Sequence, residues 1–395
     1  MDAKRIPFQI WIVSVSSMLI TASAAMFFGV FGLFLENMGI PTSKIGLIEG
    51  MVEGAGYVLK VVSGIISDYL NQRKLIFAIG VFFTAISKVI AALFFSFSAV
   101  VIGRIVDRIG NGLQASPRDA FVCDHAPRQI IGLCFGIRQC LGTLGSILGV
   151  LLVFALLARS HDDFRGVFAV ASLLALGAFV LIISCLRDAK RTTSQLSPTR
   201  GEPRQGFSLK NVLKLDRRYW WLMGIVSIFM SCRISETLIM LYGKASFKLS
   251  NSVTEEIMLV YNIFSAIAAY GTGRLTDKIR ASYLMMVGTL VTMASLIGMA
   301  VATNFVVFLC GVVLWGLQIG LMHNVFCSEI SKIVPSHYRG TGFSFYYLII
   351  AVSLLLANTI CGHLMKSGYA FAYCICACAI SCIAVPVFAK RHRQI

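Results

Sequence analysis

The chain has 395 residues, of which 57% are hydrophobic and only 13% carry a charge. Soluble domains carry about 25% charged residues, so the composition excludes an ordinary soluble globular protein and predicts a protein that lies in lipid. The formal net charge is +17, which raises nucleic acid and anionic lipid as partners until the basic residues are placed along the chain.

Apolar runs divide the chain into twelve segments. A helix needs about 20 apolar residues to cross a bilayer. Runs of this order are predicted near residues 8–35, 45–67, 75–97, 98–120, 133–157, 166–186, 219–243, 254–275, 283–302, 304–327, 341–364 and 368–389. They are continuously apolar, whereas the strands of an outer-membrane barrel alternate. The sequence therefore predicts an all-α membrane protein with twelve transmembrane helices.

A polar segment at residues 187–218 separates six predicted helices from the other six. It is rich in Arg, Lys, Ser, Thr and Pro, which is typical of a solvated linker. We therefore expect an N-terminal six-helix bundle over residues 1–186, a cytoplasmic linker over 187–218 and a C-terminal six-helix bundle over 219–395.

Lys and Arg gather in the connections on the side of the membrane that holds the N-terminus, including the 187–218 linker. Basic loops stay in the cytoplasm. We therefore expect a multi-pass protein of the inner (cytoplasmic) membrane with both termini in the cytoplasm. The positive net charge then reflects the orientation of the helices in the membrane and a contact of the basic loops with anionic lipid. Nucleic acid is not an expected partner.

One motif occurs twice, about half the chain length apart. Its residues are Gly64, Asp68, Arg73 and Lys74 in the first copy, and Gly273 and Asp277 in the second. Asp277 follows Asp68 by 209 residues, and a second pair of segments, around Pro127 and Pro335, repeats with an offset of 208. Two segments that agree on the register predict a fold built from two homologous halves.

These segments resemble motifs of the major facilitator superfamily, and the resemblance spans nearly the whole chain. Residues 64–74 resemble the superfamily's motif between helices 2 and 3, and the run from Arg108 to Gly112 resembles the helix-4 motif whose arginine faces the central cavity. Residues 46–60 and 107–120 resemble a bacterial subgroup without an assigned substrate. The resemblance implies two six-helix bundles, a gating role for the repeated motif and a substrate site between the halves near the membrane midplane.

Charged residues inside the predicted helices are the candidates for function. They comprise the acids Glu49, Glu53, Asp107 and Glu236, and the cations Lys60, Lys88, Arg104, Arg108, Arg138 and Arg233. A charge at a helix centre costs about 2.5–3.5 kcal/mol on insertion scales, so these side chains must face protein or water. Those that we select for substrate binding or coupling are Glu53, Arg104, Asp107, Arg108, Arg138, Arg233 and Glu236.

Spacing relates several of these candidates to one another. Arg104, Asp107 and Arg108 fall on one stripe of a helix, spanning about 100° together with Asn111. Arg233 and Glu236 are three residues apart and can form an ion pair. The alternative for the whole set is an internal salt-bridge lattice that contacts no ligand.

The six cations exceed the four acids by two formal positive charges, and an uncompensated buried cation needs a counter-ion. We therefore expect an anionic or zwitterionic solute held chiefly by Arg108, with Arg104 or Arg138 assisting and Arg233 closing from the other half. The alternative is a neutral or cationic solute, with other groups absorbing the excess charge. Glu53 is the expected carrier of a coupled proton.

The sequence thus predicts a monomeric secondary active transporter that moves a small solute by alternating access. Two alternatives stay open: an efflux pump for drugs or metabolites, and a membrane receptor or scaffold that transports nothing. Catalytic residues, metal ligands and cofactors are not predicted, because the sequence contains no paired metal ligands and no nucleophile–base arrangement. The direction of transport is undecided.

Overall fold

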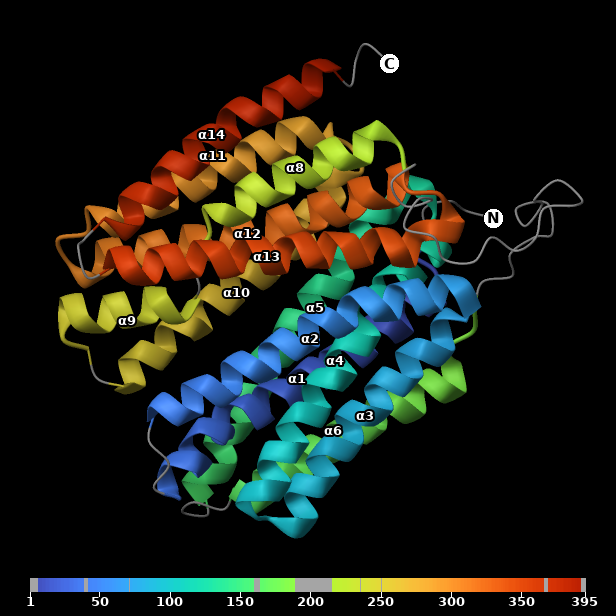
Figure 1. Cartoon of the computed structure of the whole chain (residues 1–395), viewed down its shortest axis with the longest axis vertical. Helices are drawn as coiled ribbons and strands as arrows, with labels where there is room; N and C mark the ends of the chain where they lie inside the picture. Colours follow the sequence, from blue (N-terminus) through green and yellow to red (C-terminus); the bar gives the residue numbers. More distant parts are fainter. Residues whose placement is uncertain are drawn as a thin grey trace, which may run out of the picture. The chain divides into compact units, whose positions relative to one another are not determined.

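The computed structural model describes residues 6–38, 42–70, 72–159, 164–188, 215–234, 236–249, 251–365 and 369–391. Helices make up almost all of these residues (Figure 1). The first six are α1 (Phe8–Asn37), α2 (Thr42–Leu70), α3 (Arg73–Phe94), α4 (Phe97–His125), α5 (Ile131–Arg159) and α6 (Phe164–Cys185). Those that follow are α8 (Arg217–Ser231), α9 (Glu236–Phe247), α10 (Asn251–Thr276), α11 (Ala281–Ala300), α12 (Phe305–Ile333), α13 (Arg339–Met365) and α14 (Ala370–Arg391).

The predicted all-α fold of twelve spans is confirmed, with one span interrupted. Among the described residues, six helices precede the polar 187–218 segment, and six spans begin at or after its end when α8 and α9 count as one. The prediction of an unbroken helix over 219–243 is wrong, because α8 ends at Ser231 and α9 begins at Glu236. At the end of α8, Cys232 N–H donates to Phe229 O at 3.2 Å and Arg233 N–H donates to Met230 O at 3.3 Å. These hydrogen bonds join residues three apart, as in a 3₁₀-helix, so they tighten the last turn and end the helix.

Hydropathy and length alone mark seven helices of the described chain as able to cross a membrane. The long helices α2 and α4 are not among them, because α2 carries five charged residues and α4 carries six. Membrane helices that line a polar cavity are expected to have this composition.

The chain folds into two compact units, each of which includes a piece from the other half of the sequence. Unit 1 comprises residues 1–127, 148–216 and 331–347. Unit 2 comprises residues 128–147, 217–330 and 348–395. The start of α13 therefore belongs to unit 1, and the start of α5 belongs to unit 2.

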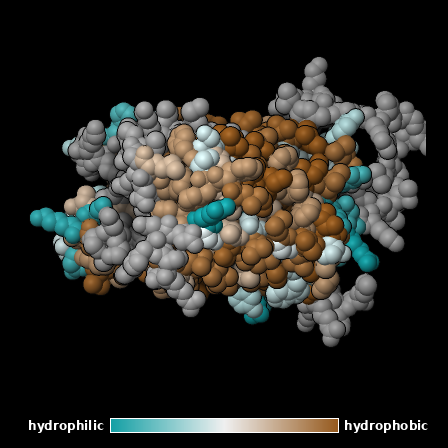
Figure 2. Space-filling model, turned by 90° about the horizontal axis from the view of Figure 1, so that it is seen from below, coloured by the Kyte–Doolittle hydropathy of each residue, from teal (hydrophilic) through white to brown (hydrophobic). Residues whose placement is uncertain are grey.

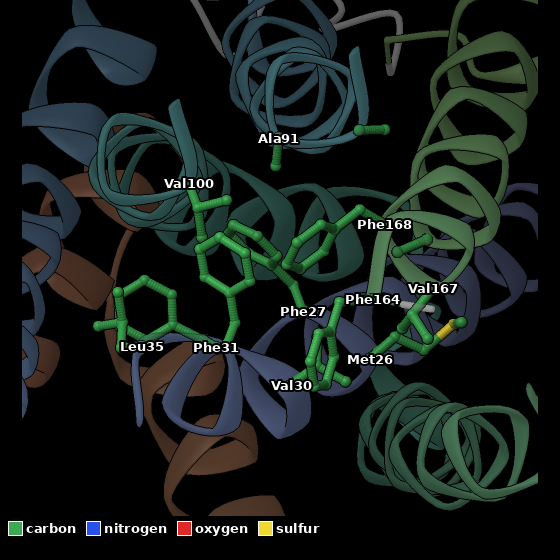
Figure 3. Close-up of a cluster of buried hydrophobic side chains, with 13 residues drawn as sticks. Met26, Phe27, Val30, Phe31, Leu35, Ala91, Val100, Phe164, Val167 and Phe168 are labelled. Carbon is green, nitrogen blue, oxygen red and sulfur yellow. The ribbon is translucent and has the colours of Figure 1, made fainter. Parts of the chain in front are cut away.

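Unit 1 is held together by a cluster of aromatic and aliphatic side chains from α1, α3, α4 and α6 (Figure 3). Phe27 of α1 packs edge-to-face on Phe168 of α6, with ring centroids 5.1 Å apart. Phe31 and Val100 lie beside this pair and are almost fully buried. Edge-to-face pairs add about 0.5–1.5 kcal/mol to the area that the rings bury.

The outer surface is apolar. Hydrophobic side chains cover most of the described surface on the face in Figure 2. On α6, Leu173 and Val180 are 67% and 61% exposed. Large apolar side chains that are this exposed on a helix face lipid in a membrane protein.

Candidate functional site

A cavity of about 190 Å³ lies within unit 1, between α2, α4 and the start of α13. Its walls are formed by Gly56, Tyr57, Lys60, Arg108, Asn111, Gly112, Ala115, Arg118 and Tyr347. α2 and α4, the two helices that are too charged to be marked as spans by hydropathy, supply eight of these nine residues. Gly112 allows the helices to approach closely, since a Cβ there would lie 2.6 Å from the Gly56 carbonyl oxygen.

Arg108 lines this cavity and keeps 19% of its side chain exposed. Its Nε lies 3.9 Å from Asp107 Oδ2, which is a long ion-pair distance. Asn111 lies one turn further along α4 and donates to the same Asp107 oxygen at 3.4 Å. Asp107 therefore sits behind the cavity wall and contacts two side chains that line the cavity.

Lys60 contributes a second cation to the cavity. Its Nζ lies 4.1 Å from the centroid of the Tyr57 ring and 5.3 Å from that of Tyr347. The Lys60 carbonyl accepts hydrogen bonds from Ser116 of α4 at 2.7 Å and from Ser344 of α13 at 3.0 Å. The backbone at Lys60 is therefore held by two other helices.

Arg118 is the third cation and was not among the sequence candidates. Its Nε lies 3.2 Å from Asp119 Oδ1, and the Tyr347 hydroxyl donates to Asp119 Oδ2 at 2.5 Å. The signal for Arg118 was its spacing, because residues 108, 111, 115 and 118 recur at helical intervals and share one face of α4. Tyr347 gave no comparable signal, since it comes from a helix more than 200 residues later.

Arg104 and Asp107 do not line the cavity. Both are fully buried, and Asp107 forms an ion pair with the equally buried Lys88 of α3. Arg104 Nη1 lies 3.7 Å from Asp107 Oδ2, and its guanidinium stacks on the rings of Phe28 and Phe31 at 5.0 and 5.5 Å. These residues form the internal charge lattice that was the alternative to ligand contact.

The remaining sequence candidates lie elsewhere. Arg138 belongs to unit 2, where its Nη2 contacts His323 Nε2 at 2.9 Å. Since arginine only donates, this nitrogen of His323 accepts. Arg233 and Glu236 form the ion pair that their spacing predicts, at 3.1 Å, across the gap between α8 and α9. The side chains of Glu49 and Glu53 lie outside the part of the chain that the structure describes.

The repeated motif places an aspartate at the start of a helix in each unit. In unit 1, Asp68 accepts hydrogen bonds from the backbone N–H groups of Gly340 and Thr341 at 3.0 and 2.6 Å, and from the Thr341 hydroxyl at 2.8 Å. In unit 2, Asp277 accepts from the backbone N–H groups of Gly132 and Leu133 at 2.7 and 2.8 Å. Both aspartates therefore cap the N-terminal end of a helix, where a negative charge is favourable.

Two motif glycines permit these caps. A Cβ on Gly64 would collide with the Gly340 backbone, and a Cβ on Gly273 would lie 2.9 Å from the Gly132 carbonyl oxygen. The helices cross where both lack side chains, which is the reason for glycine at these positions.

Arg73 and Lys74 extend the first copy of the motif. Arg73 pairs with Asp68 at 2.9 Å and with Asp124 at 2.5 Å, and Asp124 pairs in turn with Arg339 at 2.8 Å. Lys74 Nζ donates to the Ile183 carbonyl at 2.8 Å. Asp68 and Arg73 thus form one charged network with Asp124 and Arg339 around the start of α13, whereas Lys74 contacts the end of α6.

No group of three or more His, Cys, Asp or Glu in the described residues is arranged to hold a metal ion. The side chains that line the described cavity include cationic, phenolic and amide groups, which can recognise a solute by charge and hydrogen bonds.

A sequence model of the Major Facilitator Superfamily matches residues 13–358. The chain belongs to this superfamily. It is 23% identical to the uncharacterized MFS-type transporter MJ1317 of Methanocaldococcus jannaschii, over 91% of this chain and 88% of that protein. It is 24% identical to the quinolone resistance protein NorA of Staphylococcus aureus, but only over 47% of each chain.

Solved transporter structures share the fold. The human organic anion transporter MFSD10 superposes with a TM-score of 0.72 over 97% of both chains at 15% identity. The E. coli fucose:proton symporter FucP superposes with a TM-score of 0.76 over 96% of this chain and 98% of that one, at 13% identity. The protein is therefore a multi-pass membrane transporter of this superfamily.

Proposed function

We propose that the protein is a secondary active transporter of a small anionic or zwitterionic solute, which binds in the cavity of unit 1 with Arg108 as a principal contact. The observation that carries the proposal is the cavity wall, where Lys60, Arg108 and Arg118 converge on one small space. Cationic side chains aimed at one space favour an anion there, and the planar guanidinium suits carboxylate or phosphate.

The formal charges of the first half support an anion. Inside the predicted helices of this half, the cations Lys60, Lys88, Arg104, Arg108 and Arg138 outnumber the acids Glu49, Glu53 and Asp107 by two. Arg118 and Asp119 offset each other as an ion pair. Burial of net charge is costly, so a bound anion stabilises this set of residues.

The size and lining of the cavity favour a small polar solute over a drug. Sites for drug-sized molecules measure about 300–1,000 Å³ and are mostly apolar, whereas this cavity measures about 190 Å³ and is lined by three cations, two phenols and an amide. Efflux of a drug remains the second candidate, because the partial match to the quinolone resistance protein NorA supports it.

We further propose protons as the coupling ion and Glu53 as the residue that carries them. FucP, which has the same fold, is described as a proton symporter. Glu53 lies on α2, one turn before the cavity residues Gly56 and Tyr57. If Glu53→Gln still concentrates substrate with an unchanged pH dependence, this role is excluded.

Substitution of Arg108 tests the proposal. Arg108→Lys keeps a point charge but removes the bidentate fork, so the affinity for an anionic solute should fall tenfold or more, which is about 1.4 kcal/mol. Binding is measured by ligand-induced thermal stabilisation of the purified protein and by counterflow in liposomes. Arg274→Lys, at an exposed arginine of unit 2 outside the cavity, is the matched control.

Three results would contradict the proposal. One is a transported solute that proves cationic. Another is binding that survives both Arg108→Lys and Arg108→Gln unchanged. The third is the absence of any counterflow despite binding, which would favour the receptor or scaffold alternative.

A further inference from the structure

We propose that Cys361 and Cys374 form a redox-active thiol pair, which a small-molecule disulfide converts into a disulfide bond between α13 and α14. Both cysteines belong to unit 2, so the inference does not depend on the solute site of unit 1. It assigns a modification site to a part of the chain that the proposed function does not use.

The two sulfur atoms contact each other directly. Cys361 Sγ of α13 lies 3.4 Å from Cys374 Sγ of α14, and both residues are fully buried. Figure 1 shows the end of α13 next to the start of α14. A disulfide bond is about 2.0 Å long, so the sulfurs need to approach each other by about 1.4 Å. Free thiols this close need only a small movement to form the bond.

The pair lies near the connection between the two helices. α13 ends at Met365, four residues after Cys361, and α14 begins at Ala370, four residues before Cys374. About one helical turn therefore separates each thiol from the end of its helix. Helix ends open locally at a low free-energy cost. A small oxidant can therefore reach these buried thiols through local opening, while the rest of unit 2 stays folded.

The pair is also far from the end of α13 that Asp68 caps. Cys361 follows Arg339, the first residue of α13, by 22 residues, which is about 33 Å along a helix. In the orientation that the basic residues favour, the start of α13 is cytoplasmic, so the pair is close to the opposite surface of the membrane. Disulfide bonds persist in oxidising compartments outside the cytoplasm.

The reaction is a thiol–disulfide exchange in two steps. The thiolate of one cysteine attacks the S–S bond of the oxidant, which forms a mixed disulfide and releases one thiol. The second cysteine then attacks the mixed disulfide, forms the Cys361–Cys374 bond and releases the second thiol. The protons of the two cysteines pass to the two released thiols, and the two electrons reduce the S–S bond of the oxidant.

A neighbouring pair of thiols competes with this reaction. Cys232 and Cys378 also contact each other. However, Cys232 donates to the Phe229 carbonyl at 2.7 Å, and Cys378 donates to the Thr289 carbonyl at 3.2 Å. A disulfide between them would remove both hydrogen bonds and leave two buried carbonyls with one donor fewer. We therefore expect the α13–α14 pair to react first.

Peptide mapping of the purified full chain tests the proposal. The protein is treated with dithiodipyridine, a small membrane-permeable aromatic disulfide, then alkylated and digested with trypsin without reduction. Trypsin cleaves after Arg339, Lys366 and Lys390, so Cys361 and Cys374 fall on different peptides, 340–366 and 367–390. We expect mass spectrometry to find these peptides joined, with a mass lower than their sum by two hydrogen atoms. Dithiothreitol should separate them.

Two variants identify the cysteine on α14. Cys374→Ala should abolish the joined peptides. Cys376→Ala is the matched control, because Cys376 is exposed and lies two residues further along the same helix. There the joined peptides should persist. The oxidised wild-type protein should also unfold at a higher temperature than the reduced protein, because the bond closes a loop, and Cys374→Ala should lose this shift.

Three results would overturn the inference. One is that peptides 340–366 and 367–390 stay separate in the oxidised wild-type protein. Another is that they remain joined in Cys374→Ala. The third is that peptide 367–390 is joined to peptide 219–233, which contains Cys232, in place of peptide 340–366.

Discussion

Lys88 and Asp107 form an ion pair from which lipid and water are excluded, between α3 and α4. The helical spacing predicted that Arg104, Asp107 and Arg108 share a stripe of α4, and they do. It did not predict which of them reach the cavity. The three lie within about 100° of one another, and the lysine that draws Asp107 inward comes from another helix.

Breaking the Lys88–Asp107 pair should destabilise the protein more than removing it altogether. Lys88→Met leaves a buried carboxylate without its closest cation, and a loss of about 3–5 kcal/mol is expected. The double variant Lys88→Met with Asp107→Leu should recover much of this stability. Denaturant unfolding of the purified protein in detergent measures the stability of each variant. If the double variant loses as much stability as the two single variants added together, the expectation is wrong.

Among the helices, the main feature is the pair of aspartate caps, Asp68 at the start of α13 and Asp277 at the start of α5. The turns before these helices, Arg128–Ile130 and Ser336–Tyr338, repeat with the 208-residue offset predicted from the sequence. Sequence reasoning therefore located both copies of the motif. It could not identify the capped helices, because a cap depends on packing between segments that are far apart in the chain.

Asp68→Asn should weaken the cap on α13 and shift the conformational equilibrium of the transporter. The substitution removes the charge-assisted part of three hydrogen bonds and the partner of Arg73, a loss of about 1.5–3 kcal/mol. We expect greater accessibility of single cysteines placed in the cytoplasmic vestibule and lower accessibility on the other side.

Asp277→Asn is the comparison within the same fold. Its effect should be smaller, because the second copy has Ser282 where the first has Arg73, and Lys332 where the first has Asp124. Unchanged accessibility of both vestibules in Asp68→Asn would exclude a gating role for the motif.

Close helix crossings make two glycines of α10 respond differently to the same substitution. A Cβ on Gly273 meets the backbone of Gly132 and Gly136, whereas a Cβ on Gly271 meets open space. Gly273→Ala should lower stability by about 1–3 kcal/mol through overpacking, while Gly271→Ala should be neutral or mildly stabilising. Thermal unfolding of both variants tests this. Equal unfolding midpoints would mean that α10 and α5 can move apart at Gly273 without a loss of stability.

Element boundaries were less predictable than element number. The helix expected over 98–120 continues to His125, so Pro117 lies inside α4 rather than near its end. The helix expected over 219–243 is divided next to Arg233. At the second place, hydrogen bonds from Cys232 and Arg233 back to Phe229 and Met230 end α8, and the length of an apolar run does not predict such a stop.

The whole chain is a transporter of two six-helix bundles. Composition and run length predicted the twelve spans, the repeated motif predicted the two halves, and the resemblance to the major facilitator superfamily predicted transport. The substrate was not predictable to the same degree. The cavity that we propose as its site combines residues of α2 and α4 with Tyr347 of α13, and no local pattern in the sequence relates that tyrosine to Lys60 or Asp119.

Orientation in the membrane is a further prediction for the whole molecule. The distribution of Lys and Arg favours cytoplasmic termini. A fluorescent protein fused to the C-terminus should therefore fold and fluoresce, and alkaline phosphatase at the same position should be inactive. The opposite pair of results would place the C-terminus outside.

The exchange of helix ends between the two halves of the sequence bears on how the protein is made. Asp68 is synthesised long before the N–H groups of Gly340 and Thr341 that it binds, and the start of α5 long before Asp277. The first half therefore enters the membrane with one carboxylate and one helix end whose final partners do not yet exist. Expressed alone, either half should be degraded quickly, whereas the two halves produced together as separate chains should assemble and persist.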